Sequence, residues 1–277
     1  TTGGDNVAIG HNALDANTTA SNNTAVGKAA LTANTTGATN TVVGSLAMST
    51  NTTGDQNTVS GHQALKSNTT GSANVVMGLN TMYYNTTGSS NVALGRDALQ
   101  SNTTASNNTA VGTGALFANT TGIDNVAMGS GAGTALTTGS NNTAIGRVAL
   151  ATATTSSNNT AVGLSALRFT TTGANNTAVG AAAGDAVTTG LGNVLLGYQA
   201  GTYLTNLTTG AQNVLVGAYN KTNAADSTYA MGLGYNLICT SGYTTLGNST
   251  ADIRTAHGSV TWATVSDERY KKDIVDS

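Results

Sequence analysis

Apolar and polar positions alternate with a fixed period from Thr1 to Gly217. The 17-residue repeating unit is N-[TV]-A-V-G-x-x-A-L-x-x-N-T-T-G-x-x. One longer step, from Asn193 to Asn213, follows the last regular unit. We number the positions of the unit from its first asparagine. Twelve units start in this register, at Asn6, Asn23, Asn40, Asn57, Asn74, Asn91, Asn108, Asn125, Asn142, Asn159, Asn176 and Asn193.

The pattern inside each unit predicts short strands and turns. Position 2 is Thr or Val, position 3 is Ala, Val or Leu, and position 4 is apolar except at Ser60. A short, β-branched segment of this kind predicts a strand of about four residues. Position 5 is glycine in all twelve units, from Gly10 to Gly197, which allows a turn or a close backbone approach. The A-L pair at positions 8 and 9 predicts a second short strand. N-T-T-G predicts a turn in which Asn tolerates the left-handed conformation and Gly supplies a positive φ.

Two strands and two turns in each unit predict one coil of a solenoid. Helical repeats need about 33 residues or more, so the unit is too short for them. The fold class expected is all-β, a parallel β-solenoid (β-roll) of twelve coils stacked about 4.8 Å apart. Proline is absent from the chain, as expected where each backbone N–H bonds to a neighbouring coil. We expect the solenoid over residues 1–217, an irregular β transition and capping region over 218–265, and a separate C-terminal segment over 266–277.

Stacking places equivalent residues in columns. The asparagines of position 1 are expected to form a ladder of side-chain amides along the axis. Position 12 starts a second such column, which gives way to apolar or small residues, so we expect the surface or the contacts of the solenoid to change near residue 130. The asparagines of this column are Asn17, Asn34, Asn51, Asn68, Asn85, Asn102 and Asn119, followed by Leu136, Ala153, Thr170 and Val187.

The core expected for a single chain is thin. Burial contributes about 25 cal/mol per Å² of apolar surface, and alanine has little such surface. Positions 3 and 4 point to opposite faces of a strand, so both faces need cover. We expect one face to fill the coil and the other, mostly alanine, to pack against a neighbouring chain. Three chains around one axis are the natural arrangement for a fibre.

Little in the composition indicates catalysis or ligand chemistry. The formal net charge is −2 and 8% of residues are charged, which gives no footprint for nucleic acid or an anionic membrane. The single cysteine, Cys239, excludes an internal disulfide and is expected to be a buried apolar residue. His11 and His62 lie three coils apart, roughly 14 Å, so they cannot share a metal. We therefore expect no cofactor, no metal site and no enzyme acting on an external substrate.

Aromatic residues occupy some of the variable positions 10 and 11. Two interpretations are open for them: stacking against sugars, or packing at interfaces between chains. The region after Ala218 is richer in tyrosine, and its segments YAMGLG and YTTLG look like worn copies of the repeat. The aromatic residues of positions 10 and 11 are Tyr83, Tyr84, Phe117 and Phe169.

The unit N-[TV]-A-V-G-x-x-A resembles the head repeats of trimeric autotransporter adhesins. That resemblance implies a left-handed parallel β-roll packed as a homotrimer. The full 17-residue unit is similar to repeats of phage tail fibres and related surface proteins. The likeness covers residues 1–217.

A second resemblance lies at the C-terminal end. The run from Ser266 to Ile274, SDERYKKDI, is similar to the opening S-D-x-R-x-K-x-x-I of the endosialidase-type intramolecular chaperone. This resemblance implies help with trimerisation and self-cleavage before Ser266, with Ser266 as nucleophile and Lys271 as base. A serine hydroxyl needs such a base, and a desolvated lysine can serve. Residues 266–277 match only the start of such a domain, so the chaperone is truncated here.

Three functions fit these patterns. The first is the shaft of a phage tail fibre, located on the virion outside the cell. Its partners would be two further copies of the chain, other tail proteins and a host cell-surface receptor, with a glycan as one candidate. The second is a bacterial surface adhesin with a trimeric β-roll head, which a secretion signal or membrane anchor in the full gene would identify. The third is an ice-binding solenoid that uses the Thr-Thr ladders of positions 13 and 14, which a thermal hysteresis assay would test.

Overall fold

The structure is a computed structural model that describes residues 2–249, 251–259 and 263–264. These residues form strands and turns, and no helix occurs among them. The chain divides into two compact units, Thr1–Asn159 and Thr160–Ser277. Each unit is a parallel β-solenoid, and equivalent residues of paired strands lie 17 residues apart in unit 1 and in the first strands of unit 2. The predicted fold class is therefore confirmed for both units.

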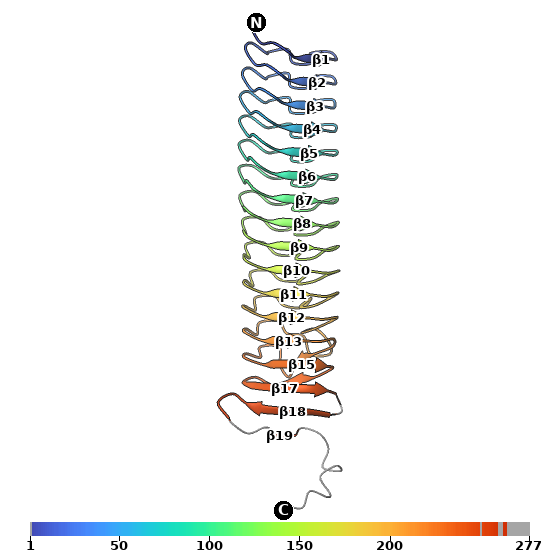
Figure 1. Cartoon of the computed structure of the whole chain (residues 1–277), viewed down its shortest axis with the longest axis vertical. Helices are drawn as coiled ribbons and strands as arrows, with labels where there is room; N and C mark the ends of the chain where they lie inside the picture. Colours follow the sequence, from blue (N-terminus) through green and yellow to red (C-terminus); the bar gives the residue numbers. More distant parts are fainter. Residues whose placement is uncertain (1, 250, 260–262, 265–277) are drawn as a thin grey trace, which may run out of the picture. The chain divides into compact units, whose positions relative to one another are not determined.

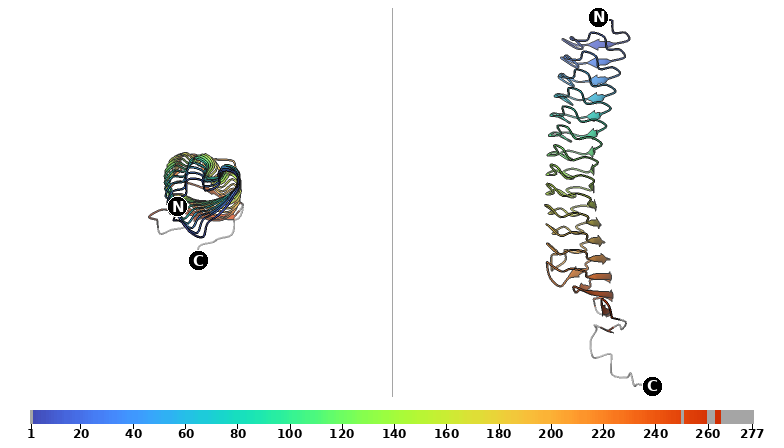
Figure 2. Two further views of the ribbon diagram at one scale, coloured as in Figure 1. Left: turned by 90° about the horizontal axis from the view of Figure 1, so that it is seen from above. Right: turned by 90° about the vertical axis from the view of Figure 1, so that its left-hand side faces the viewer.

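Unit 1 (Thr1–Asn159) stacks nine three-residue strands in chain order, one per coil (Figure 1). Neighbouring strands pair in parallel with equivalent positions opposite one another, as in Thr41↔Thr58 and Val42↔Val59. The strands lie along one side of the coil and the turns make up its other sides (Figure 2). The strands are β1 (Val7–Ile9), β2 (Thr24–Val26), β3 (Thr41–Val43), β4 (Thr58–Ser60), β5 (Val75–Met77), β6 (Val92–Leu94), β7 (Thr109–Val111), β8 (Val126–Met128) and β9 (Thr143–Ile145).

The alanine face of each strand points into the coil, which is the reverse of our expectation. In β3 the position 3 residue Val42 is fully buried, whereas Val43 at position 4 is 42% exposed. Alanine fills position 3 in most coils, as Ala25 and Ala110 do, and is equally buried. Most coils also hold a leucine or methionine at position 9 and one or two asparagines in the interior. Little space remains inside, so the larger side chain of position 4 faces outward.

The second strand predicted at positions 8 and 9 does not form. Positions 6 to 11 are turns, and positions 7 and 9 adopt the left-handed conformation, with φ values of 56° at Ala29 and 51° at Leu31. The leucine side chain is nevertheless fully buried, as predicted for the core. Its backbone also bonds to the next coil, from Leu31 N to Ala47 O at 3.1 Å. Inter-coil hydrogen bonding therefore extends well beyond the strands.

The glycine of position 5 is required by its conformation and by the next coil. Gly112 has a φ of 129°, which residues with a Cβ rarely adopt. A Cβ at this position would lie 2.7 Å from the carbonyl carbon of Gly129, which is backbone and cannot move aside. Gly180 in unit 2 has the same geometry, with a φ of 135° and Gly197 in the next coil. The close approach predicted for this glycine is confirmed. The positive φ predicted for the glycine of N-T-T-G is wrong, since Gly37 and Gly54 do not adopt one.

Unit 2 (Thr160–Ser277) begins with coils of the same kind and then changes its strand pairing. Six strands stack in parallel, and the segments YAMGLG and YTTLG form the last two of them, β15 and β17. Strands β18 and β19 then pair antiparallel, and β14 pairs with β16 in a separate small sheet. The strands are β10 (Thr160–Val162), β11 (Thr177–Val179), β12 (Val194–Leu196), β13 (Val214–Val216), β14 (Lys221–Thr222), β15 (Met231–Tyr235), β16 (Ile238–Cys239), β17 (Tyr243–Asn248), β18 (Ala251–Ala256) and β19 (Ala263–Thr264).

Candidate interaction surfaces

The residues predicted for self-cleavage, Ser266 and Lys271, lie outside the residues that the structure describes. Their proposed roles as nucleophile and base stay predictions.

The position 1 asparagines form the predicted amide ladder, and the ladder is buried. Asn40 donates from its backbone N to Asn23 Oδ1 at 2.9 Å and from its Nδ2 to the same oxygen at 3.2 Å. Its Nδ2 also donates to Gly54 O at 3.0 Å. Buried amides are stable only when their donors and acceptors are satisfied, and this arrangement satisfies them coil after coil. From Asn23 onward these amides are buried, so the column supports the fold.

The second asparagine column, at position 12, is also interior. Asn51 Nδ2 donates to Asn34 Oδ1 at 2.7 Å and to Gly54 O at 2.9 Å. The column ends at Asn119, whose buried Oδ1 has no hydrogen-bond partner, because Leu136 occupies the next coil. The change near residue 130 was predicted at the surface or the contacts of the solenoid. The prediction that the surface changes is wrong, because Asn119 and Leu136 are both fully buried and the change lies in the core.

Core volume is conserved where the column changes. Leu136 at position 12 occurs in the coil that has Gly133 at position 9, where most coils have leucine or methionine. A Cβ on Gly133 would lie 3.0 Å from Leu116 Cδ2. In unit 2, Val187 at position 12 occurs in the coil with Gly184 at position 9, and a Cβ there would lie 2.7 Å from Leu195 Cδ1. A larger residue at one interior position therefore accompanies glycine at the other.

The two threonine columns, at positions 13 and 14, differ in how far their side chains are exposed to solvent. At position 13 the hydroxyl bonds to the next coil, as from Thr35 Oγ1 to Thr52 O at 2.9 Å and from Thr52 Oγ1 to Thr69 O at 3.0 Å. Threonine at position 14, such as Thr36 and Thr53, is exposed. Only one of the two columns considered for ice binding therefore presents its side chains fully to solvent.

The outward side chains of the strands form an apolar surface in each unit. We call positions 2 and 4 of the strands the outer β-face. In unit 1 it includes Val43, Met77 and Met128, which are 42%, 55% and 43% exposed, and the intervening residues are mostly Val and Thr. Leu233 in β15 of unit 2 is 55% exposed. Large apolar side chains aligned on one face are typical of a surface that another protein covers.

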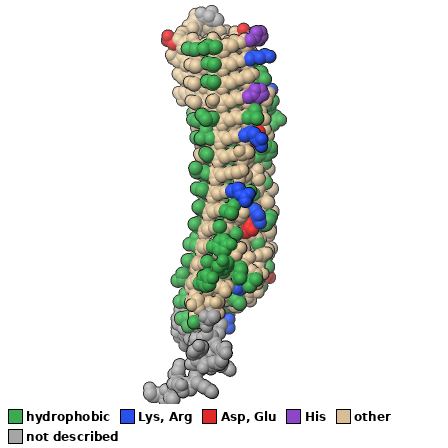
Figure 3. Space-filling model, turned by 90° about the vertical axis from the view of Figure 1, so that its right-hand side faces the viewer, with side chains coloured by type: hydrophobic (Ala, Val, Ile, Leu, Met, Phe, Trp, Pro, Cys, Tyr) green, Lys and Arg blue, Asp and Glu red, His purple; other side chains and the backbone are tan. Residues whose placement is uncertain are grey.

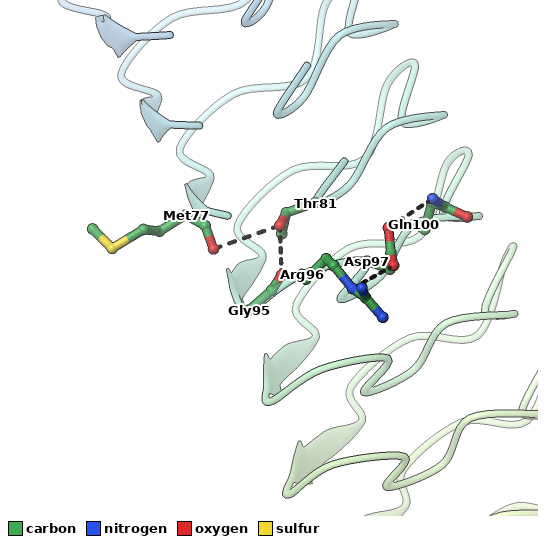
Figure 4. Close-up of polar contacts among 6 residues, drawn as sticks. All are labelled: Met77, Thr81, Gly95, Arg96, Asp97 and Gln100. Carbon is green, nitrogen blue, oxygen red and sulfur yellow. Dashed lines mark hydrogen bonds and ion pairs between the residues drawn. The ribbon is translucent and has the colours of Figure 1, made fainter. Parts of the chain in front are cut away.

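A corner follows the outer β-face at position 6, and in unit 1 it is basic. Figure 3 shows lysine, arginine and histidine side chains following one another along one side of the view. An acid, Asp97, stands beside them at position 7; it pairs with Arg96 (Nε to Oδ2, 3.2 Å) and accepts from Gln100 Nε2 at 3.1 Å (Figure 4). The exposed basic residues of position 6 are His11, Lys28, His62, Arg96 and Arg147.

Departures from the repeat are compensated locally. Thr81 replaces the usual alanine of position 8 and is fully buried. Its hydroxyl donates to Gly95 O at 2.6 Å, with Met77 O a further acceptor at 3.5 Å (Figure 4). Because the buried hydroxyl is satisfied, the coil tolerates this substitution.

The aromatic residues of positions 10 and 11 do not gather into one site. Tyr83 and Tyr84 contact each other with ring centroids 4.6 Å apart, and Lys66 Nζ lies 2.9 Å from Tyr83 Oη. Phe117, two coils further on in unit 1, is 39% exposed. Phe169 belongs to unit 2, where the Arg168 guanidinium lies 4.2 Å from its ring centroid. Both interpretations of these residues, sugar stacking and interface packing, stay open.

Unit 2 holds a tyrosine cluster that the sequence indicated only as an enrichment. Tyr219 makes edge-to-face contacts with Tyr198, Tyr203 and Tyr235 at centroid distances of 5.3, 4.8 and 5.6 Å. Desolvation by these neighbours raises the pKa of the Tyr219 phenol. A hollow of about 330 Å³ lies against Tyr203, Tyr219 and Tyr235. The repeat register could have revealed part of this cluster, because Tyr198 and Tyr235 both follow a glycine equivalent to position 5 and so occupy equivalent places in their coils.

Cys239 is fully buried, as predicted, and burial raises the pKa of its thiol to about 12, so the thiol stays protonated at neutral pH. Within the described part of the chain, no group of three or more His, Cys, Asp or Glu side chains could hold a metal ion.

Across the described ranges, no helix has the length and apolar character needed to cross a membrane. Comparison of the chain with protein-family models, curated proteins and solved structures gave no match.

Proposed function

We propose that this chain is a structural protein, the shaft of a phage tail fibre, in which three copies pack side by side. The exposed apolar outer β-face is the observation that supports this proposal. Val43, Met77 and Met128 are 42%, 55% and 43% exposed in one chain, and a neighbouring copy would remove them from water. Because the interior of each coil accepts only small residues at position 3, the larger side chains of position 4 face outward and form an apolar surface that another chain can cover.

A fibre shaft also accounts for the rest of the molecule. Its coils use their polar side chains to satisfy one another, as the two asparagine ladders do, and this serves rigidity. In this proposal the protein is not an enzyme, needs no cofactor, and acts outside the cell on a virion that attaches to a host. A bacterial surface adhesin would use the same fold, and the proposal for its trimer would be identical.

Light scattering on the purified full chain tests the assembly. The expected native mass is three times the chain mass of 27.4 kDa. Replacing Met77 by Lys puts a charge on the outer β-face and should shift the mass toward that of one chain. The matched control is Thr87→Lys, which adds the same charge at the exposed position 14 of the same coil.

A native mass of one chain for the unaltered protein would contradict the trimer. Ice binding by a monomeric solenoid would then become the better proposal, because exposed threonines of position 14 recur once per coil. Thermal hysteresis measured on the same monomer would test that alternative directly. A trimer that Met77→Lys leaves intact would place the interface elsewhere on the coil.

A further inference from the structure

We propose that the tyrosine cluster of unit 2 is a binding site for an acidic glycan, with a sugar ring on the tyrosines and a carboxylate at Lys221. This inference rests on the proposed function in one respect: host attachment needs a site that contacts a receptor. All residues of the site belong to unit 2.

The aromatic part of the site is exposed and ordered by its own contacts. Tyr198 and Tyr235 are 47% and 54% exposed, and both stand nearly perpendicular to Tyr219, at interplanar angles of 89° and 88°. These contacts hold the rings in place before any ligand arrives. Aromatic rings with an apolar face and a polar hydroxyl suit sugars, which present C–H groups and hydroxyls on the same ring.

Polar groups for sugar hydroxyls line the same hollow. Gln199 and Asn236 border the space of about 330 Å³ beside the tyrosines. A side-chain amide can both donate and accept, which matches the paired donor and acceptor character of a sugar hydroxyl. Asn236 also borders a second hollow of about 370 Å³, so this residue lines both spaces.

Lys221 gives the site its preference for an acid. Its side chain lines the second hollow, yet the residue is only 6% exposed. Its ammonium donates to Asn236 Oδ1 at 2.9 Å and lies 5.0 Å from the Tyr203 ring centroid. Among the described residues, ion pairs join Arg96 to Asp97 and Arg168 to Asp185, so Lys221 takes part in none.

A buried lysine is normally paired with an acid, because the charge is otherwise held away from water without compensation. Lys221 has neutral partners instead, which leaves its charge available to an anion. Arg254 and Asp252 also line the second hollow, so cations outnumber acids there by one. A carboxylate on a sugar whose ring lies on Tyr235 would complete the missing ion pair.

Saturation-transfer NMR on the full chain tests the site with named probes. The acidic probes are sialyllactose and trigalacturonate, and the neutral probes are lactose and maltotriose, all at millimolar concentration. We expect transfer to the acidic probes and much weaker transfer to the neutral ones. Tyr235→Ala and Lys221→Gln should each weaken binding of the acidic probe about tenfold, the first by removing the ring that the sugar contacts and the second by removing a charge-assisted contact. Tyr84→Ala, an exposed tyrosine of unit 1, is the matched control and should change nothing.

Four results would overturn the proposal: no transfer to either acidic probe, equal transfer to acidic and neutral probes, binding that survives Tyr235→Ala, or a fall in native mass caused by Tyr235→Ala. The last would show that the tyrosines belong to an interface between chains. Tyr235 is exposed, so its variant should fold even if the buried Lys221→Gln variant does not. Light scattering on the same samples separates the two proposals, because a monomer that binds the acidic probe contradicts only the trimer.

Discussion

The first seven coils of unit 1 and the coils of unit 2 have similar backbones but different side chains at the interior position 12. In the first region a column of asparagines at position 12 bonds coil to coil, as Asn85 does to Asn68 Oδ1 at 2.7 Å. In unit 2 the same position begins with Thr170, whose hydroxyl donates to Val187 O at 3.1 Å. It continues with Val187 and, after the three-residue insertion, Leu207, and all three residues are fully buried. The strand register is the same in both regions.

This contrast indicates that the coil accepts either a satisfied polar column or an apolar one. The requirement in the polar region is continuity, because every amide depends on the coil before it and the coil after it. The requirement in the apolar region is volume, which glycine at position 9 adjusts. Asn119 lies at the end of the polar column, and its Oδ1 is the group left without a partner.

The corner beside the outer β-face differs between the units as well. In unit 1 it presents cations such as Lys28 and Arg147, whereas in unit 2 it presents Tyr198 and Tyr235. Position 6 is exposed in both places, so the fold does not constrain which residue stands there. Such a position is free to carry recognition, and we assign that role to the tyrosine cluster of unit 2.

The strongest destabilisation should come from the feature that the two regions share. Gly112→Val in unit 1 and Gly180→Val in unit 2 should each destabilise their coil by about 4 kcal/mol or more, because a Cβ collides with backbone and φ is unfavourable. Thermal unfolding followed by circular dichroism measures the loss. Thr113→Val, at the exposed position next to Gly112, is the control. Unchanged unfolding of either glycine variant would show that the coil geometry at position 5 is wrong.

A smaller loss should distinguish the polar column from the apolar one. Asn85→Leu removes the bonds to Asn68 Oδ1 and to Gly88 O, and it also leaves the donor of Asn102 without its acceptor. We expect a loss of about 3 kcal/mol in the free energy of unfolding, since unsatisfied buried amides are costly. Denaturant titration gives the value.

Thr87→Leu, on the exposed turn of the same coil, is the control for that experiment and should change stability little. If Asn85→Leu were as stable as the parent, the polar column would have no advantage at that position, and the coil would be governed by volume in both regions.

The weakest of the three changes concerns the boundary between the two interiors. Gly133→Leu alone should cost about 2 kcal/mol through overpacking against Leu116. Adding Leu136→Asn restores the common pairing of positions 9 and 12 and offers Asn119 Oδ1 a donor. The double variant should therefore recover the loss in a thermal melt, with Leu136→Asn alone as the control for cavity formation. A double variant less stable than Gly133→Leu would contradict the volume rule.

Much of the fold was predictable because the repeat is strict. The 17-residue period, the strand at positions 2 to 4, the glycine of position 5 and the buried leucine of position 9 all follow from periodicity and residue chemistry. The second strand was predicted wrongly, because an A-L pair does not reveal that its leucine adopts a φ near 51°, as Leu31 does. The candidate site was less predictable, since its tyrosines, Tyr198, Tyr203, Tyr219 and Tyr235, are spread over several coils.

Stacking of the coils in register follows from the sequence alone, because every column repeats and no proline interrupts the hydrogen bonds between coils. The face that turns inward depends instead on the tertiary structure. A narrow coil accepts alanine at position 3 and an amide at position 12, so the bulkier side chains of position 4 remain outside. The burial of Lys221 beside neutral partners is also a tertiary effect, since Asn236 and Tyr203 meet it from separate coils.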